Sequence, residues 1–128
     1  MKNSEMVLEY LKQQGLCPEL HEDEVIIFKF QMATFLYMID DDDKYFFRLA
    51  MPNIFDVTED NRISVLEAIN QVTFTVKVAK LYIPSEADNV WASAEVLLDG
   101  TPELDDIVPR LLHVLLGARH EFYKAIDE

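Results

Sequence analysis

Three strand-like runs constrain this fold more than any other feature of the sequence, because both alternating faces of each run are largely apolar. The runs are EVIIFKFQ (24–31), ATFLYMID (33–40) and KYFFRLAM (44–51). In the first run Ile26 and Phe28 point to one face, while Ile27 points to the other. Three short helices are too few to cover both faces of such a sheet. We therefore expect a second copy of the chain or a client polypeptide to supply the missing layer.

The charge balance is strongly acidic, with 24 Asp and Glu against 11 Lys and Arg and a formal net charge of -13. Nucleic-acid affinity depends on Lys and Arg that displace counterions, so DNA and RNA are disfavoured partners. Anionic membrane surfaces are disfavoured for the same reason. Solubility is the ordinary explanation of such a charge, although the same field also attracts basic polypeptide segments.

The length and the single cysteine restrict the organisation and the compartment. A chain of 128 residues that is 50% hydrophobic predicts a single domain over residues 1–128 rather than a disordered segment. Cys17 is the only cysteine, so neither an intrachain disulfide nor a cysteine-based zinc site is possible. The first fifteen residues have the spacing of an amphipathic helix and lack the features of a signal peptide. No run reaches the roughly 20 apolar residues of a membrane helix, and we expect a cytoplasmic protein.

The first half of the chain predicts a helix followed by a meander of strands. The apolar spacing predicts a helix over Ser4–Gln14, which Gly15 ends. A polar connection at 17–24 leads to the three strand-like runs. Short connections between these runs favour antiparallel hairpins, and Pro52 closes the third strand because it cannot donate to a ladder.

The second half predicts a helix, two strands and a final helix. Thr58 is a good N-cap for a helix that ends near Val72, before strands at 73–84 and 90–99. Thr101 is the expected cap of the last helix, in which Pro109 predicts a kink or a second helix start. The expected order is α-β-β-β-α-β-β-α, an α+β fold with a five-stranded antiparallel sheet.

This arrangement, and above all the stretch LEAINQVTFTVKVAKLYI at Leu66–Ile83, resembles the YbjN family. Its members are described as bacterial sensory transduction regulators with a fold similar to that of type III secretion chaperones. The resemblance covers nearly the whole chain. It implies a domain that commonly dimerises and that, in the secretion-chaperone branch, holds an extended segment of another protein on exposed apolar patches. It implies no catalysis, and the kink expected at Pro109 is a departure that affects the last helix and the dimer surface.

Four adjacent carboxylates at Asp40–Asp43 form the sharpest chemical cluster. Their mutual repulsion could be relieved by Ca²⁺ or Mg²⁺. An EF-hand loop that begins at Asp40 needs Gly at its sixth position and a carboxylate at its twelfth, where this chain has Tyr45 and Met51. We favour a solvated hairpin tip over a cation site.

Other chemistry-bearing residues give no constellation. His113 and His120 share a helix face but lie roughly 10 Å apart along the axis, too far for one metal ion, and His21 lies in an acidic loop. Neither Cys17 nor any serine lies in a nucleophile motif, and with Gly at 15, 100 and 117 alone no phosphate-binding loop is present. We therefore expect no catalytic, metal or cofactor site.

Four aromatic residues are the candidates for a partner-binding surface, with the ordinary core as the competing interpretation of each. They are Phe46, Phe47, Phe74 and Trp91. The hypothesis we prefer is a non-enzymatic protein-binding module, chaperone-like or a regulatory adaptor, that acts as a homodimer. The alternative is a small-molecule or divalent-cation sensor, with the ligand under the last helix or at the aspartate loop. An uncharacterised hydrolase is the remote third possibility.

Overall fold

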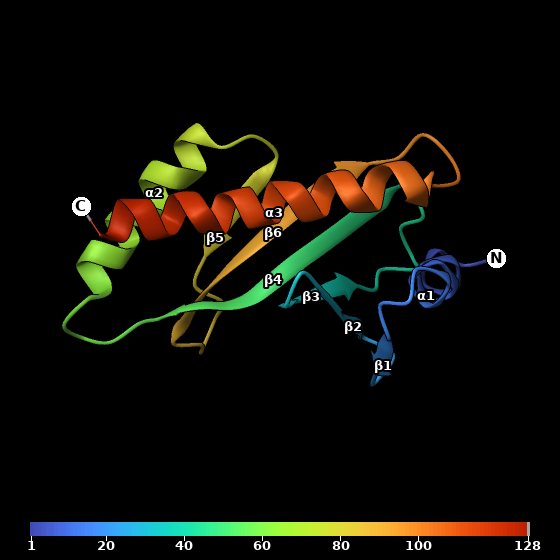
Figure 1. Ribbon diagram of the computed structural model, residues 1–128, viewed down its shortest axis with the longest axis horizontal. Helices are drawn as coiled ribbons and strands as arrows, with labels where there is room; N and C mark the ends of the chain where they lie inside the picture. Colours follow the sequence, from blue (N-terminus) through green and yellow to red (C-terminus); the bar gives the residue numbers. More distant parts are fainter. Residues whose placement is uncertain (128) are drawn as a thin grey trace.

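The apolar runs of the sequence become the central strands of one antiparallel sheet (Figure 1). The computed structural model describes residues 1–127. Its elements are α1 (Asn3–Gln13), β1 (Glu19–His21), β2 (Val25–Phe30), β3 (Ala33–Met38), β4 (Phe46–Asp56), α2 (Arg62–Thr75), β5 (Ala79–Tyr82), β6 (Asn89–Leu97) and α3 (Leu104–Ile126). The strands are ordered β1-β2-β3-β4-β6-β5, and all neighbouring pairs are antiparallel. The predicted α+β class and antiparallel sheet are confirmed, but the described residues form six strands rather than five.

The additional strand is β1, which lies in the segment expected to be a polar connection. It pairs with β2 through Leu20 opposite Ile26. Glu22 and Asp23 both adopt positive φ angles, 52° and 56°, as the two central residues of a type I′ hairpin turn do. All three residues of β1 are exposed, so backbone pairing rather than apolar burial forms this strand.

Two helix starts differ from the expected ones for a local reason. Thr58 makes the reciprocal hydrogen bonds of an N-cap, since its hydroxyl accepts the N–H of Asn61 at 3.2 Å while the Asn61 side-chain oxygen accepts the N–H of Thr58 at 2.7 Å, but the residues that it caps form a turn before α2. This pair closes a turn, and α2 begins at Arg62 and continues to Thr75, beyond the predicted end. Likewise α3 begins at Leu104 rather than directly after the predicted cap.

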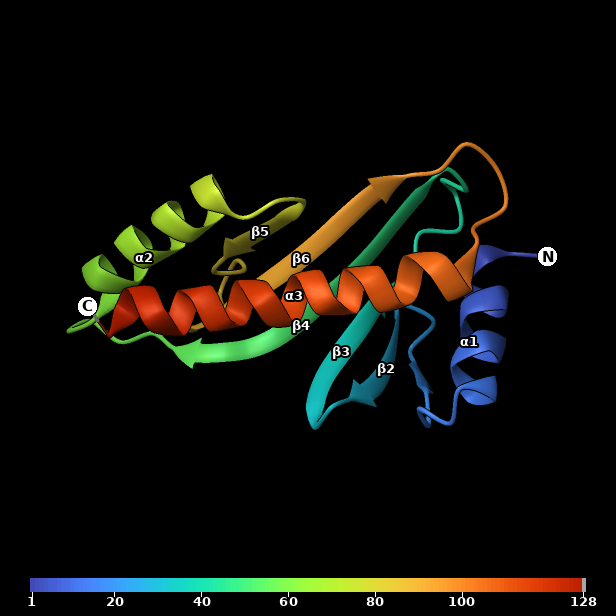
Figure 2. The ribbon, with the colours of Figure 1, turned by 45° about the horizontal axis from the view of Figure 1, so that its top comes forward.

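Helix α3 is continuous through its proline. It runs from Leu104 to Ile126 with Pro109 inside it, so the second helix start that the sequence suggested is not present (Figure 2). Pro109 lies in the second turn, where the helix loses only the hydrogen bond to the carbonyl of Asp105. The seven buried residues of α3 include Leu115 and Phe122, which are fully buried. No helix of residues 1–127 is long and apolar enough to cross a membrane.

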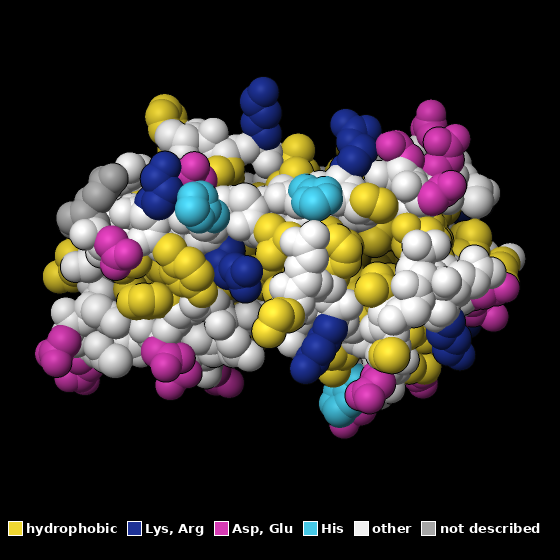
Figure 3. Space-filling view, viewed as in Figure 1, with side chains coloured by type: hydrophobic (Ala, Val, Ile, Leu, Met, Phe, Trp, Pro, Cys, Tyr) yellow, Lys and Arg dark blue, Asp and Glu magenta, His cyan; other side chains and the backbone are white. Residues whose placement is uncertain are grey.

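All three helices lie on one face of the sheet (Figures 1 and 2). α3 crosses β4, β5 and β6, α2 packs beside α3 and β5, and α1 packs against β2. The sheet residues beneath them share one register and one core with the helices. They include Ile26, Phe28, Phe35, Tyr37, Phe47, Leu49, Met51, Ala92 and Ala94. Seen from the helix side, hydrophobic patches border α3 and acidic side chains gather mainly toward the ends of the molecule (Figure 3).

Candidate interaction surface

The second face of the sheet is not covered by any helix of the described residues, and we call it the open face. The strand register identifies its members, because paired residues point to the same side. Its apolar members are Val25, Ile27, Leu36, Met38, Phe46, Ala50, Trp91 and Leu97, of which Leu36 and Ala50 are buried. Its polar members include Lys29, Thr34, Arg48, Lys80, Tyr82, Ser93 and Glu95. The open face therefore combines apolar side chains with a polar network on β4, β5 and β6.

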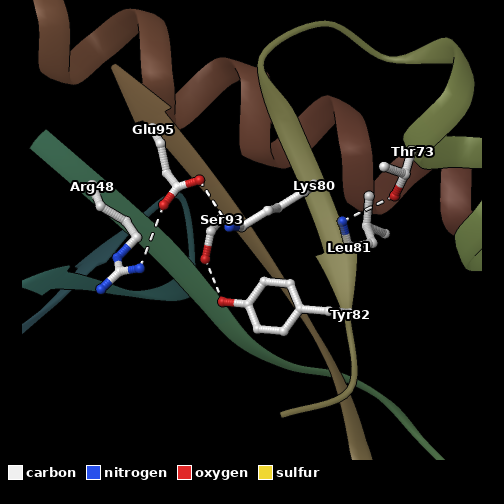
Figure 4. A network of polar contacts seen from close by, with 7 residues as sticks. All are labelled: Arg48, Thr73, Lys80, Leu81, Tyr82, Ser93 and Glu95. Carbon is white, nitrogen blue, oxygen red and sulfur yellow. Dashed lines mark hydrogen bonds and ion pairs between the residues drawn. The ribbon is translucent and has the colours of Figure 1, made fainter. Parts of the chain in front are cut away.

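The polar network crosses three strands (Figure 4). The Glu95 carboxylate on β6 lies 3.4 Å from the Arg48 guanidinium on β4 and 2.9 Å from the Lys80 ammonium on β5. The hydroxyls of Tyr82 and Ser93 are hydrogen-bonded to each other beside it. Partly exposed ion pairs add little stability. The network instead holds these side chains in place between Phe46 and Leu97 at one end of the face and Trp91 at the other.

Arg48 retains binding capacity within this network. Its guanidinium lies 5.5 Å from the centroid of the Phe46 ring and donates to Glu95 through one nitrogen. Its Nε is buried and out of reach of a partner, but the side chain as a whole is 33% exposed. A guanidinium has five N–H donors in a planar fork. Arg48 is therefore suited to bind a carbonyl or carboxylate of a partner that lies on Phe46.

The four aromatic candidates do not gather at one place. Phe46 and Trp91 are partly buried members of the open face, although roughly 20 Å of strand separates their positions. Phe47 is fully buried on the helix side, with its ring centroid 5.1 Å from that of Tyr37. The core interpretation therefore holds for Phe47, because α3 covers the face to which it points. Phe74 is 87% exposed, but it lies on α2 and not on the sheet.

Sequence reasoning missed two parts of the open face. Leu97 is 85% exposed and pairs with Phe46, and the alternation within 90–99 could have placed it beside Trp91 on one face. The contacts of Arg48, Lys80 and Glu95 could not have been found in this way. They come from three separate strands, and their proximity depends on a register that the sequence does not specify.

The aspartate loop is engaged in local structure. The Asp41 carboxylate accepts the backbone N–H of Ser4 at 3.1 Å and its hydroxyl at 2.6 Å, at the first turn of α1. The Asp43 carboxylate accepts the N–H of Tyr45 at 3.1 Å. These bonds satisfy a helix N-terminus and a turn. Across residues 1–127, no three His, Cys, Asp or Glu side chains are grouped so that they could hold a metal ion.

The loop also acts on a buried tyrosine. Burial, followed in size by the negative charges of Asp41 and Asp40, raises the pKa of Tyr37 to about 12. Desolvation and nearby anions both disfavour the phenolate. Tyr37 is therefore a neutral core residue at physiological pH.

The histidines and the cysteine are not brought together. His21, His113 and His120 are all exposed, and the ring of His113 contacts Phe30 edge-on at 6.0 Å between centroids. Cys17 is a free, exposed thiol. A nucleophile needs a base within hydrogen-bond reach, and no side-chain hydrogen bond in the described chain joins Cys17 to a base.

Two solved structures resemble this fold over nearly its whole length. A crystal structure of an uncharacterized protein from Methanothermobacter thermautotrophicus has a TM-score of 0.62 and 15% identity, covering 98% of this chain and 96% of that chain. The crystal structure of YbjN, described as "a putative transcription regulator from E. coli", has a TM-score of 0.66 and 10% identity, covering 94% of this chain and 89% of that chain. At these identities the likeness shows a shared fold alone. No protein-family model and no curated protein matches the sequence.

Proposed function

We propose that this chain is a non-enzymatic protein-binding module, chaperone-like or a regulatory adaptor, which acts in the cytoplasm as a homodimer and binds another polypeptide on the open face. One observation carries the proposal: all three helices cover the same face of a sheet whose other face also bears apolar side chains. The fold shared with YbjN, which is described as "a putative transcription regulator", supports a regulatory role. As part of the same function, we propose that the fold is similar to that of type III secretion chaperones.

The open face has features that suit a polypeptide segment. Burying about 400 Å² of its apolar area would contribute on the order of 10 kcal/mol before the entropy of association is subtracted. Between Phe46 and Trp91, the charged groups of Arg48, Lys80 and Glu95 are available to a backbone or a side chain. Such a mixture of apolar anchors and oriented polar groups is typical of protein interfaces.

The charge of the surroundings favours a segment that is basic at one end. The open face itself is not acidic, because its polar members include Lys29, Arg48 and Lys80 against Glu95. Acidic loops lie beyond its Phe46 end, where the N–H of Leu98 donates to the carbonyl of Tyr45 at 2.7 Å. These are the loops of Asp40–Asp43 and Asp99. Opposite charge at that end would fix the direction in which the segment binds.

Photocrosslinking in the native cell tests this proposal. A photoreactive amino acid is placed at Leu97, which is 85% exposed on the open face, and in a matched variant at Met32, which is fully exposed at the β2–β3 turn. We expect a discrete adduct with another polypeptide from position 97 and none from position 32. Equal labelling at both positions, or no adduct at position 97, would contradict the proposal. An adduct with a second copy of the chain would reassign the open face to self-association.

The cation-sensor alternative has less support, because Asp41 and Asp43 already accept hydrogen bonds from Ser4 and Tyr45. Its own measurement is calorimetric titration with Ca²⁺ and Mg²⁺. A stoichiometric micromolar response, lost on replacing Asp41 and Asp43 by Asn, would favour the sensor. The lack of enzymatic activity remains a prediction.

A further inference from the structure

The pairing between β3 and β4 stops after two residue pairs. Leu36 lies opposite Ala50 and Tyr37 lies opposite Leu49, and the described strands contain no further pair between them. Toward the start of β3 the two strands diverge (Figure 2). Each continues to pair on its other side, β3 with β2 and β4 with β6. The sheet therefore has a gap in its interior, between β3 and β4.

Pro52 explains where this ladder stops. The two-residue turn at 31–32 has positive φ angles of 50° and 66°, so hydrogen bonding to β2 starts directly after the turn and recurs at every second residue of β3. The alternate residues, Thr34 and Leu36, direct their N–H and C=O groups toward β4. The register that pairs Leu36 with Ala50 sets Thr34 opposite Pro52, which has no N–H to donate. The carbonyl of Thr34 is therefore without a ladder donor.

A cavity of about 220 Å³ lies at this gap, and we call it the gap cavity. Its walls come from residues 32–34, from residues 51–54 of β4, and from Arg119 and Tyr123 of α3. The Tyr123 hydroxyl donates to the carbonyl of Ile54 at 2.9 Å. Because residues four apart share one side of a helix, this bond also holds the turn that carries Arg119 against the cavity.

Arg119 is the one charged residue that lines the gap cavity. It is half-buried, and none of the ion pairs within residues 1–127 includes it. The positions three and four residues away on α3 are Leu115, Leu116, Phe122 and Tyr123, so the helix supplies no acid to pair with it. Four larger hollows of the molecule each include a carboxylate side chain. The gap cavity is therefore a positive site on a chain whose net charge is -13.

The groups around the gap cavity match those of an α-amino acid. The guanidinium of Arg119 suits a carboxylate, which it binds through two parallel N–H donors. The carbonyl of Thr34 accepts from an ammonium group in place of the N–H that Pro52 lacks. Met51 and Ile54 are buried apolar residues that form a wall for a side chain. A volume of about 220 Å³ is below the roughly 300–1,000 Å³ of pockets for drug-sized ligands, so one amino acid fits better than a peptide.

We propose that the gap cavity binds a free apolar α-amino acid, with its carboxylate on Arg119, its ammonium on the carbonyl of Thr34 and its side chain against Met51 and Ile54. The ligand bridges β3 to α3 across the gap, so its binding should also stabilise the folded chain. The inference goes beyond the client proposed for the open face. The photocrosslink at Leu97 and the titrations below are separate measurements, and neither result decides the other.

Calorimetric titration with L-alanine, L-valine and L-methionine tests the site. At least one of the three should bind one-to-one with a Kd of about 1 mM or tighter. Arg119→Gln keeps a polar side chain but removes the charge, and it should weaken binding at least tenfold. The matched control Arg110→Gln makes the same change on α3 at an exposed residue outside the gap cavity, and it should leave the Kd unchanged. Circular dichroism checks that both variants keep the fold.

Derivatives of the amino acid that binds assign the two polar contacts. Its N-acetyl form lacks the ammonium and its amide lacks the carboxylate, so each should bind at least tenfold more weakly. Pro52→Ala supplies an N–H that competes for the carbonyl of Thr34, and it should weaken binding several-fold. No binding by any of the three amino acids, or unchanged binding in Arg119→Gln, would overturn the inference. Equal binding of the N-acetyl form would also overturn it, since the site would then accept the carboxyl end of a polypeptide.

Discussion

At the scale of single residues, Tyr37 links the core to the aspartate loop. It is 1% exposed, and its pKa is raised from 10.0 to about 12 by burial and by Asp41 and Asp40. The folded state thus holds the phenolic proton more tightly than the unfolded state does. For a group whose pKa is raised on folding, the stabilisation is complete below the unfolded pKa and is lost as the pH rises through the folded pKa. The relevant window is therefore between pH 10 and pH 12.

The free energy of unfolding should fall by about 2 to 3 kcal/mol more in the wild type than in Tyr37→Phe as the pH rises from 9 to 12. Phenylalanine keeps the ring in the core but has no proton to lose. Urea unfolding of both proteins at half-unit steps of pH measures the difference. Parallel pH profiles of the two proteins would show that Tyr37 ionises normally.

Asp41 should matter for stability more than its neighbours in the loop. Asp41→Ala removes two hydrogen bonds to Ser4 at the start of α1, a loss of about 1 to 2 kcal/mol. Asp42 is exposed and makes neither bond, so Asp42→Ala is the matched control and should change stability by less than about 0.5 kcal/mol. The midpoints of urea unfolding give both values, and equal effects would contradict the capping role.

At the scale of elements, apolar alternation in the sequence predicted the strands that bury apolar side chains and missed β1, whose residues are all exposed. β2, β3 and β4 bury apolar residues, so their pattern is visible in the sequence. β1 is fully exposed and exists through pairing with β2. Thr58 has the side chain of an N-cap and its hydroxyl accepts the N–H of Asn61, yet the turn that this bond closes lies before α2, which begins at Arg62.

The candidate site was predictable only in part for a related reason. Alternation puts Phe46 and Phe47 on opposite faces, but both faces are apolar and the sequence does not indicate which one α3 covers. That choice is made by the packing of α3, which buries Phe47 and leaves Phe46 on the open face. The exposure of Phe74 likewise follows from the side of α2 that packs against α3, and not from its own residue type.

Two helix aromatics should therefore differ sharply in their effect on stability. Phe122 of α3 is fully buried, with its ring centroid 5.5 Å from that of Phe55, and Phe122→Ala should cost about 3 to 5 kcal/mol. Phe74→Ala, at a position that is 87% exposed, should change the stability of the monomer by less than about 0.5 kcal/mol. Urea unfolding at submicromolar concentration measures both. A large loss in Phe74→Ala would mean that α2 packs differently.

At the scale of the whole molecule, the net charge of -13 opposes the dimer that we propose. Treated as point charges about 30 Å apart in water, two such copies repel by on the order of 20 kcal/mol without salt. Each exposed ion pair across an interface contributes at most about 1 kcal/mol. The long-range repulsion therefore outweighs the local pairs unless it is screened. The screening length falls from about 30 Å at 0.01 M salt to about 8 Å at 0.15 M.

Salt should consequently strengthen self-association. We expect the dissociation constant of the dimer to fall at least tenfold when NaCl is raised from 10 to 150 mM, measured by sedimentation equilibrium. Lys77→Glu raises the net negative charge of each copy, so its dimer should depend on salt more steeply than that of the wild type. Tighter association at 10 mM would mean that short-range ion pairs at the interface outweigh the repulsion. Because apolar burial is insensitive to such salt concentrations, any change over this range reports the charges alone.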